Sequence, residues 1–294
     1  MRVAVIGNCQ AQGLAEWLDA LSPEVTAEAF SVAGVSPDDP EARSRWRGLI
    51  DRSDWVIMQT GPEHRAKFGL PDPDAIRSEG RRVTMAPWIL FRGFHPDCTY
   101  LFHAGAPMPG AAGPLQSAIA LGARLEGLPQ ARALKLYNAY VYARLGYFDA
   151  HAAALDLMRE EWSALGLDAS RWLSWSGEPF MHTINHPIPP VLEDLARQLL
   201  AGAGLAARPA PETMPPDHLS GCGDWPVYPE IAERLGMGGG TAYRTPGQAD
   251  TPLEAAVAAA YAGLDAALAD GFVLDPAASP LVARVCAFIR DAVI

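Results

Sequence analysis

The chain has 294 residues and is 49% hydrophobic, which is enough for one large α/β domain or for a core domain with a smaller cap. Its formal net charge of -11 disfavours nucleic acids and anionic membranes as main partners, because a protein that tracks phosphates needs a basic surface. The four cysteines lie far apart without Cys-x-x-Cys spacing, so neither a zinc ribbon nor a dense disulfide framework is expected.

The N-terminus lacks the pattern of a secretory signal peptide. No apolar stretch approaches the roughly 20 residues that a membrane span needs. We therefore expect a cytoplasmic protein without a transmembrane segment.

Strand-like and helix-like segments alternate through the first half of the chain. This alternation favours βαβ units around a mostly parallel sheet, and so an α/β fold. The expected strands are residues 3–6, 26–32, 55–59, 82–85 and 100–103, and the expected helices between and after them are 42–50, 73–78 and 114–126.

The second half of the chain has mainly helical patterns. Stretches rich in Pro and Gly, at 207–216 and 236–240, indicate a lid or connector. We expect an α/β catalytic core over residues 1–203, followed by a lid and helical C-terminal extension over residues 204–294. The expected helices here are 147–165, 191–200, 253–269 and 280–294.

Cys9 lies directly after the first expected strand, in the sequence Gly-Asn-Cys-Gln at 7–10. An apolar helix face follows it, formed by Leu14, Trp17, Leu18 and Leu21, so the helix is expected to begin near the cysteine. The N-terminal end of a helix favours a thiolate and can lower a cysteine pKa from about 8.5 toward neutrality. The alternative is that Cys9 is a small, buried, apolar side chain. The polar neighbours Asn8 and Gln10 argue against this alternative.

Ligands of open α/β sheets bind beyond the carboxyl ends of the strands, where Cys9, Gly34 and Gln59 are expected to meet. An acyl transfer there needs hydrogen-bond donors for the developing oxyanion. The Cys9 and Gly34 N–H groups and the Gln59 side chain are the candidates, with Asn8 and Gln10 as positioning residues. Alternatively, Gln59 is a structural amide and Gly34 an ordinary turn glycine.

A cysteine nucleophile needs a base, and His186 is our choice among seven histidines. His182 is a candidate supporting residue or substrate contact, and Glu178 and Asn185 are candidates to orient His186. The alternative is that both histidines are ordinary polar loop residues. A Cys–His dyad suffices, because a positioned thiolate is already a competent nucleophile.

An aromatic and phosphate-bearing ligand such as coenzyme A could be held by Trp88, Arg92 and Phe94. The alternative is that the aromatic rings pack in the core and that the arginine is exposed to solvent. The scattered His, Asp and Cys residues form no metal-binding pattern, so no metal is expected.

The Gly-Asn-Cys-Gln turn at 7–10, together with Met-His-Thr-Ile-Asn-His-Pro at 181–187, resembles the WcbI-type polysaccharide biosynthesis acetyltransferase family. That family looks like a cysteine-bearing relative of the SGNH (GDSL-like) hydrolases. The resemblance implies a three-layer α/β/α fold, acetyl-coenzyme A as donor, and acetyl transfer to a sugar hydroxyl of a surface or capsular polysaccharide. Cys9 and His186 match the catalytic pair, whereas Thr183 stands where an SGNH hydrolase carries Asp, which favours a dyad.

Two other functions stay open at this point. A thiol-dependent esterase or deacetylase would use water as the acceptor on the same scaffold. A non-catalytic glycan-binding protein would carry an inert Cys9. Within the transferase hypothesis, His186 could also deprotonate the acceptor for direct transfer while Cys9 only shapes the site.

Overall fold

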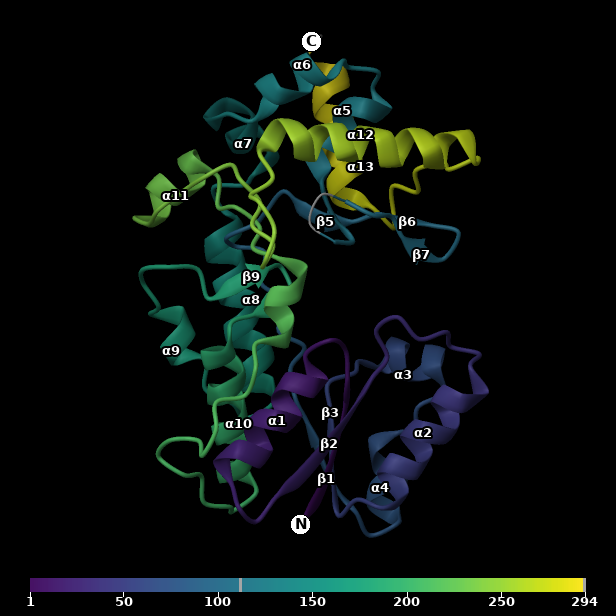
Figure 1. Ribbon diagram of the computed structural model, residues 1–294, viewed down its shortest axis with the longest axis vertical. Coiled ribbons are helices and arrows are strands. Elements are labelled where there is room, and N and C mark those ends of the chain that lie inside the picture. The colour runs from purple at the N-terminus through teal and green to yellow at the C-terminus, as the bar shows by residue number, and fades with distance from the viewer. Residues whose placement is uncertain (111–112, 293–294) are drawn as a thin grey trace. The chain divides into compact units, whose positions relative to one another are not determined.

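The computed structural model describes residues 1–110 and 113–292 (Figure 1). Contacts between residues divide the chain into two compact units that interleave along the sequence. These units are defined by contacts between residues, whereas the expected boundary at residue 203 separates a catalytic core from a lid. That functional boundary therefore stays a prediction. Unit 1 comprises Met1–Leu90, Met158–Leu173 and His186–Leu219, and unit 2 comprises Phe91–Leu157, Ser174–Asn185 and Ser220–Ile294.

Unit 1 is built on a four-stranded parallel sheet in the order β2-β1-β3-β4. Four of the five expected strands are confirmed, and their carboxyl ends lie at one edge because all four run in the same direction. The strands are β1 (Arg2–Gly7), β2 (Thr26–Ser31), β3 (Trp55–Met58) and β4 (Arg82–Met85).

Helices cover both faces of this sheet, which gives unit 1 the expected three-layer α/β/α arrangement (Figure 1). Successive strand residues point to opposite faces. Ile6 and Met58 pack with Trp46 in one buried cluster, and Val5 and Ile57 are fully buried on the other side. One layer holds α1 (Ala11–Leu21) and α10 (Pro189–Gly202), and the other holds α2 (Pro40–Asp51), α3 (Pro62–Phe68) and α4 (Pro73–Ser78).

Unit 2 is mainly helical, and α5 packs against α12 and α13 in its core (Figure 1). The division between the units falls within α8 (Ala150–Ala164). The longer helices are α5 (Ala118–Leu125), α7 (Ala139–Leu145), α8, α11 (Pro229–Leu235), α12 (Leu253–Ala269) and α13 (Pro280–Asp291). The short elements of unit 2 are α6 (Gln130–Ala133), β9 (Met181–Thr183) and the 3-10 helix η1 (Leu134–Leu136). Unit 1 holds the short elements α9 (Ser170–Leu173) and β10 (His186–Pro187), and the 3-10 helix η2 (His218–Cys222) extends across the division.

The expected fifth strand at 100–103 is wrong. This segment is divided between β5 (Cys98–Tyr100) and β6 (Phe102–His103), which pair antiparallel with β8 (Leu115–Ser117) and β7 (Ala106–Pro107) outside the parallel sheet. The expected helix 114–126 begins later, at Ala118, because Ser117 caps it by accepting a hydrogen bond from the Ala120 N–H.

Most helices of the second half were expected, with differences at their ends. α12 has the expected bounds, α8 and α10 differ by one to three residues at each end, and α13 ends at Asp291. The last two residues of the expected helix 280–294 lie outside the described residues. Helices α3, α7 and α11 were not anticipated, since each has only seven residues and carries little periodicity.

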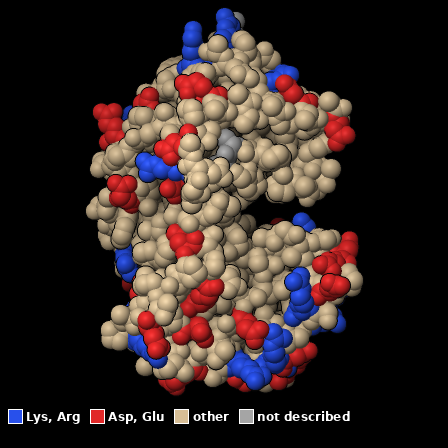
Figure 2. Space-filling model, in the orientation of Figure 1, with Lys and Arg blue, Asp and Glu red and all other residues tan. Residues whose placement is uncertain are grey.

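Acidic side chains are spread over the face shown in Figure 2, and basic side chains lie among them rather than in a continuous surface. This distribution agrees with the net charge of -11. Among residues 1–110 and 113–292, no helix combines the length and apolarity that crossing a membrane requires.

Replacing glycine by alanine should have opposite effects on stability at two helical positions. A Cβ on Gly122 would lie 2.5 Å from Cγ1 of the buried Val285, so Gly122→Ala should destabilise by about 1–3 kcal/mol through overpacking between α5 and α13. A Cβ on Gly48 of α2 would meet only an Arg52 nitrogen at 3.7 Å, so Gly48→Ala should stabilise by about 0.4–1 kcal/mol. Urea denaturation measures the free energy of unfolding of both variants. Equal changes in this free energy would contradict the close packing of α5 against α13.

Candidate active site

Cys9 lies in the turn between β1 and α1, half-buried. Asn8 closes this turn in two ways. Its Oδ1 accepts the Gln10 N–H at 2.8 Å, and its carbonyl oxygen accepts the Ala11 N–H at 3.1 Å. The turn therefore fixes the backbone on both sides of the cysteine at the carboxyl edge of the sheet.

Gln10 fastens this turn to the segment that follows β4. Its side chain is fully buried, and Nε2 donates to the Ile89 carbonyl at 2.8 Å while Oε1 accepts the Ile89 N–H at 3.2 Å. An amide that bonds both groups of one residue has a fixed orientation. The Gln10 side chain thus holds the protein backbone, and its expected substrate-positioning role stays a prediction.

Gln59, directly after β3, links the same elements. Its Nε2 donates to the Pro87 carbonyl at 3.1 Å and to Gln10 Oε1 at 3.5 Å, so both amide hydrogens have protein acceptors. These contacts agree with the alternative of a structural amide, and the oxyanion role of Gln59 stays a prediction. A Cβ on Gly7 would lie 2.8 Å from Gln59 Oε1, so only glycine allows this approach.

Asn8 supplies a donor beside the cysteine. Its Nδ2 is buried and has no hydrogen-bond partner among residues 1–110 and 113–292. A buried N–H group without a partner is costly unless a ligand or water satisfies it. Asn8 is thus the predicted positioning residue whose geometry best suits contact with a substrate oxygen.

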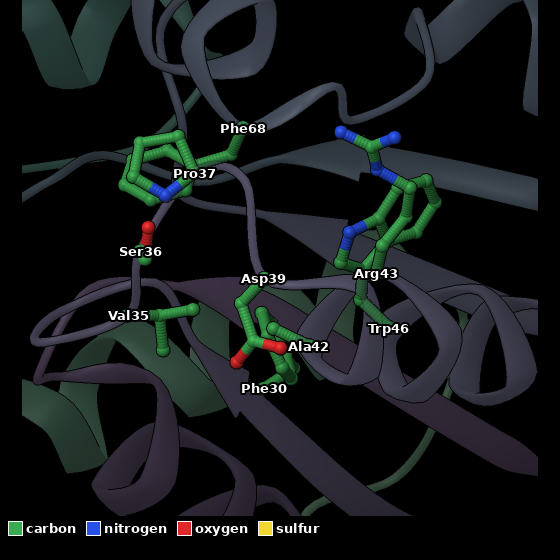
Figure 3. A pocket seen from close by; sticks show the side chains of 9 residues that line it. All are labelled: Phe30, Val35, Ser36, Pro37, Asp39, Ala42, Arg43, Trp46 and Phe68. Carbon is green, nitrogen blue, oxygen red and sulfur yellow. The ribbon is translucent and has the colours of Figure 1, made fainter.

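Gly34 lies in the exposed loop that follows β2, with a φ of +75°. The start of this loop is tied to the nucleophile turn, because the Val32 N–H donates to the Gly7 carbonyl at 2.8 Å. The rest of the loop borders a small pocket against α2 and α3 (Figure 3). Its lining is mostly apolar and consists of Phe30, Val35, Ser36, Pro37, Asp39, Ala42, Arg43, Trp46 and Phe68.

The ends of α10 show where His186 lies in unit 1. Arg82, at the amino end of β4, donates to the carbonyls of Gly202 and Ala203 at the C-terminal end of α10. The 14 residues of α10 span about 21 Å, close to the roughly 20 Å of a six-residue strand. The helix therefore begins near the carboxyl edge of the sheet, and His186 precedes it by three residues.

Contacts at the start of α10 agree with this placement. Leu192 Cδ1 lies 2.8 Å from the position of a Cβ on Gly13, so the first turns of α1 and α10 touch (Figure 1). Cys9 precedes α1 by two residues and the buried His186 precedes α10 by three. The two predicted catalytic residues therefore belong to the same edge of unit 1, whereas their catalytic roles stay a prediction.

The three expected supporting residues all lie in unit 2. His182 Nδ1 lies 2.6 Å from Asp224 Oδ1, and Asn185 Nδ2 donates to the Tyr100 hydroxyl at 3.1 Å. Glu178 is exposed, and its carbonyl oxygen accepts the Trp175 indole N–H. Their expected roles toward His186 stay predictions. Asp224 was missed by the sequence analysis, because it lies 42 residues from its partner in an irregular segment.

Two of the expected coenzyme A residues, Arg92 and Phe94, belong to unit 2, and Trp88 belongs to unit 1. Phe94 is 1% exposed and packs against Phe91, His151 and Phe180, and Arg92 donates to the Cys98 carbonyl at 2.7 Å. Both therefore have structural roles in unit 2, and a buried ring such as Phe94 offers no face to a ligand. Contact of coenzyme A with Phe94 and Arg92 stays a prediction.

Trp88 of unit 1 is the exposed member of the expected set. It is 38% exposed and meets His64 edge-on, with ring centroids 5.5 Å apart. No group of three or more His, Cys, Asp or Glu side chains suited to a metal ion occurs within the described ranges.

Comparison with known proteins identifies the family. A model of the polysaccharide biosynthesis enzyme WcbI matches residues 2–208, and the chain belongs to this family, as its two motifs led us to expect. None of the curated proteins matches the chain. A solved WcbI structure has a TM-score of 0.65 and 16% identity, covering 97% of this chain and 98% of that one, which supports the α/β fold. That structure was described as the native protein without a disulfide bond between coenzyme A and one of its cysteines.

The Gln10 contacts predict a specific loss of stability. Gln10→Ala leaves the Ile89 N–H and carbonyl without their buried partners, which should lower the free energy of unfolding by about 1–3 kcal/mol. Gln12→Ala is the matched control, because Gln12 donates only to Glu16 on the helix surface. Urea denaturation should show a change within about 0.5 kcal/mol for the control. A similarly small change for Gln10→Ala would contradict the proposed anchoring.

The four thiols should differ in reactivity. Burial raises the pKa of Cys98 and Cys222, and it raises that of Cys286 to about 11. We therefore expect iodoacetamide at pH 7 to modify Cys9 first, as peptide mapping by mass spectrometry would show. Cys222 is the internal control, because it is half-buried like Cys9. Equal labelling rates for these two would mean that Cys9 has no special reactivity.

Proposed function

We propose that this protein transfers an acyl group from coenzyme A to a sugar hydroxyl of a surface or capsular polysaccharide, with Cys9 as nucleophile and His186 as its base. One observation carries the proposal: the Cys9 turn is held by buried amides at the sheet edge where α10 also begins. Ligands of open α/β sheets bind at this edge. Family membership supports the polysaccharide as the product class.

The donor is inferred from the sulfur chemistry. The related WcbI structure was described with coenzyme A and a cysteine named together and no disulfide bond between them, which supports coenzyme A as the compound that meets a protein sulfur. An acyl-coenzyme A in a similar position would present its thioester carbonyl to the nucleophile. Applied to this chain, the sulfur that receives the acyl group is Cys9.

In the first step, His186 takes the Cys9 proton and the thiolate attacks the thioester carbonyl. The bond between the carbonyl carbon and the coenzyme A sulfur breaks, and the leaving thiolate takes the proton from His186. Asn8 Nδ2 is the donor that we assign to the developing oxyanion, since it is buried beside Cys9 and lacks a described protein partner.

In the second step, a sugar hydroxyl attacks the acyl group on Cys9. The new ester bond forms as the hydroxyl proton passes to His186, the bond between the acyl carbon and sulfur breaks, and the imidazolium returns the proton to the Cys9 thiolate. Gln10 and Gln59 act before either step, because they fix the turn and limit the reorganisation that the reaction requires. An esterase would perform the same first step and use water in the second.

Labelled acetyl-coenzyme A tests the first step. The parent protein should retain label on Cys9 after denaturation, Cys9→Ser should retain none, and His186→Ala should acquire it about 10²–10⁴-fold more slowly, as for loss of a general base. Cys222→Ser is the control and should behave like the parent, because Cys222 lies outside the nucleophile turn. Equal labelling of all four proteins would refute the catalytic assignment. Release of acetate without transfer to any glycan acceptor would indicate the esterase.

A further inference from the structure

A second pocket of unit 1 opens at the carboxyl edge of the sheet, beside the Cys9 turn. It has a volume of about 400 Å³, which lies in the range of small-molecule sites. Its lining comes from the segments 60–65 and 72–77 and from Met85 at the end of β4, all within unit 1. Thr60 directly follows Gln59, whose side chain contacts Gln10 of the turn. We call this the Arg65 pocket.

Arg65 gives the pocket a positive charge that no described carboxylate neutralises. The residue is half-buried, and its Nη1 donates to the Thr60 carbonyl at 2.7 Å, which fixes the guanidinium. The other charged groups of the lining are bonded to one another. Arg77 pairs with Asp74 at 2.5 Å, and Asp72 accepts the Asp74 N–H at 2.9 Å. The remaining N–H groups of Arg65 are therefore the donors that the pocket offers to an anion.

Thr60 adds a hydroxyl to the same pocket. The residue is 5% exposed, and its Oγ1 is buried with no hydrogen-bond partner in the part of the chain that the structure describes. A buried hydroxyl without a partner costs free energy, and a ligand that bonds to it removes this cost. A hydroxyl can donate to an anion. Arg65 and Thr60 thus combine a fixed positive charge with a neutral donor.

This pair of donors suits a phosphate group better than a carboxylate. A guanidinium binds two oxygens of either anion through two parallel N–H groups. A carboxylate then has both of its oxygens engaged, whereas a phosphate keeps at least one further oxygen for the Thr60 hydroxyl. Both substrate classes of the proposed reaction include phosphate-bearing compounds, since coenzyme A carries phosphates and so do sugar phosphates.

We propose that the Arg65 pocket binds a phosphate group of a substrate, with the Arg65 guanidinium and the Thr60 hydroxyl as its donors. This inference rests on the proposed function for the two substrate classes, and it adds the place where one of them is anchored. Neither residue contacts the reacting atoms, so both are binding residues. The anchored substrate is held at the sheet edge that carries Cys9, which favours the reaction by orientation.

Thr60→Val distinguishes a hydroxyl that binds a ligand from one that supports the fold. Valine has a similar shape and removes the unbonded hydroxyl, so the urea midpoint of the free protein should stay the same or rise. Binding of the phosphate compound should weaken by about 3–10-fold. A lower urea midpoint with unchanged binding would mean a structural hydroxyl and would overturn its assigned role.

Isothermal titration calorimetry of the whole chain tests the charge. Coenzyme A is compared with pantetheine, which has the same thiol arm without phosphate, and glucose 1-phosphate is compared with glucose. Arg65→Ala should weaken binding of one phosphate compound by about 10–100-fold and leave its phosphate-free partner unchanged. A loss for coenzyme A assigns the phosphate to the donor, and a loss for glucose 1-phosphate assigns it to the acceptor. Unchanged binding of both phosphate compounds, or their failure to bind the parent protein, would overturn the inference.

Two further variants complete the comparison. Gly61→Asp adds a negative charge to the pocket and keeps Arg65, and a Cβ on Gly61 meets nothing within 4 Å. It should weaken phosphate binding by about 10-fold, and it decides the case if Arg65→Ala does not fold. Arg47→Ala is the matched control, because Arg47 is exposed on α2, forms no ion pair with a described residue and lies outside the pocket.

The control variant should change phosphate binding by less than about twofold, since solvent and salt screen an exposed charge. Equal weakening in Arg47→Ala and Arg65→Ala would show a general effect of charge and would overturn the inference. Calorimetry requires no turnover, so its result is independent of the labelling of Cys9. A specific loss of phosphate binding in Arg65→Ala supports the pocket even if the protein transfers no acyl group, which would refute the proposed function alone.

Discussion

The carboxyl edge of the parallel sheet depends on two buried glutamine amides. Burying an amide costs free energy unless its donors and acceptor are bonded, so Gln10 and Gln59 are stable only when Ile89 and Pro87 lie opposite them. This requirement joins the segments that follow β1, β3 and β4. The position of Cys9 therefore follows from the hydrogen bonds that Gln10 and Gln59 make in the interior.

Unit 2 also contains a buried polar group that must be hydrogen-bonded, and here it is a carboxylate. Asp97 is fully buried and accepts hydrogen bonds from the Tyr147 and Tyr228 hydroxyls and from the Ile119 N–H, at 2.9 to 3.0 Å. Burial nevertheless raises the pKa of this carboxyl, and no described cation pairs with it. These contacts connect α5 with residues that follow α7 and precede α11, so Asp97 organises the unit around polar groups in its interior.

The sequence by itself determined the four parallel strands, the helix after Cys9 and the family, because strand runs, helical periodicity and short motifs are local features of the chain. Only the tertiary structure decided what the polar side chains do. Gln10 bonds to a residue 79 positions away and His182 to one 42 positions away, and no pattern encodes such distances. The hydrogen bonds of Gln59 were not predicted for the same reason: an amide is donor and acceptor at once, and only its neighbours in the fold show which groups are already bonded.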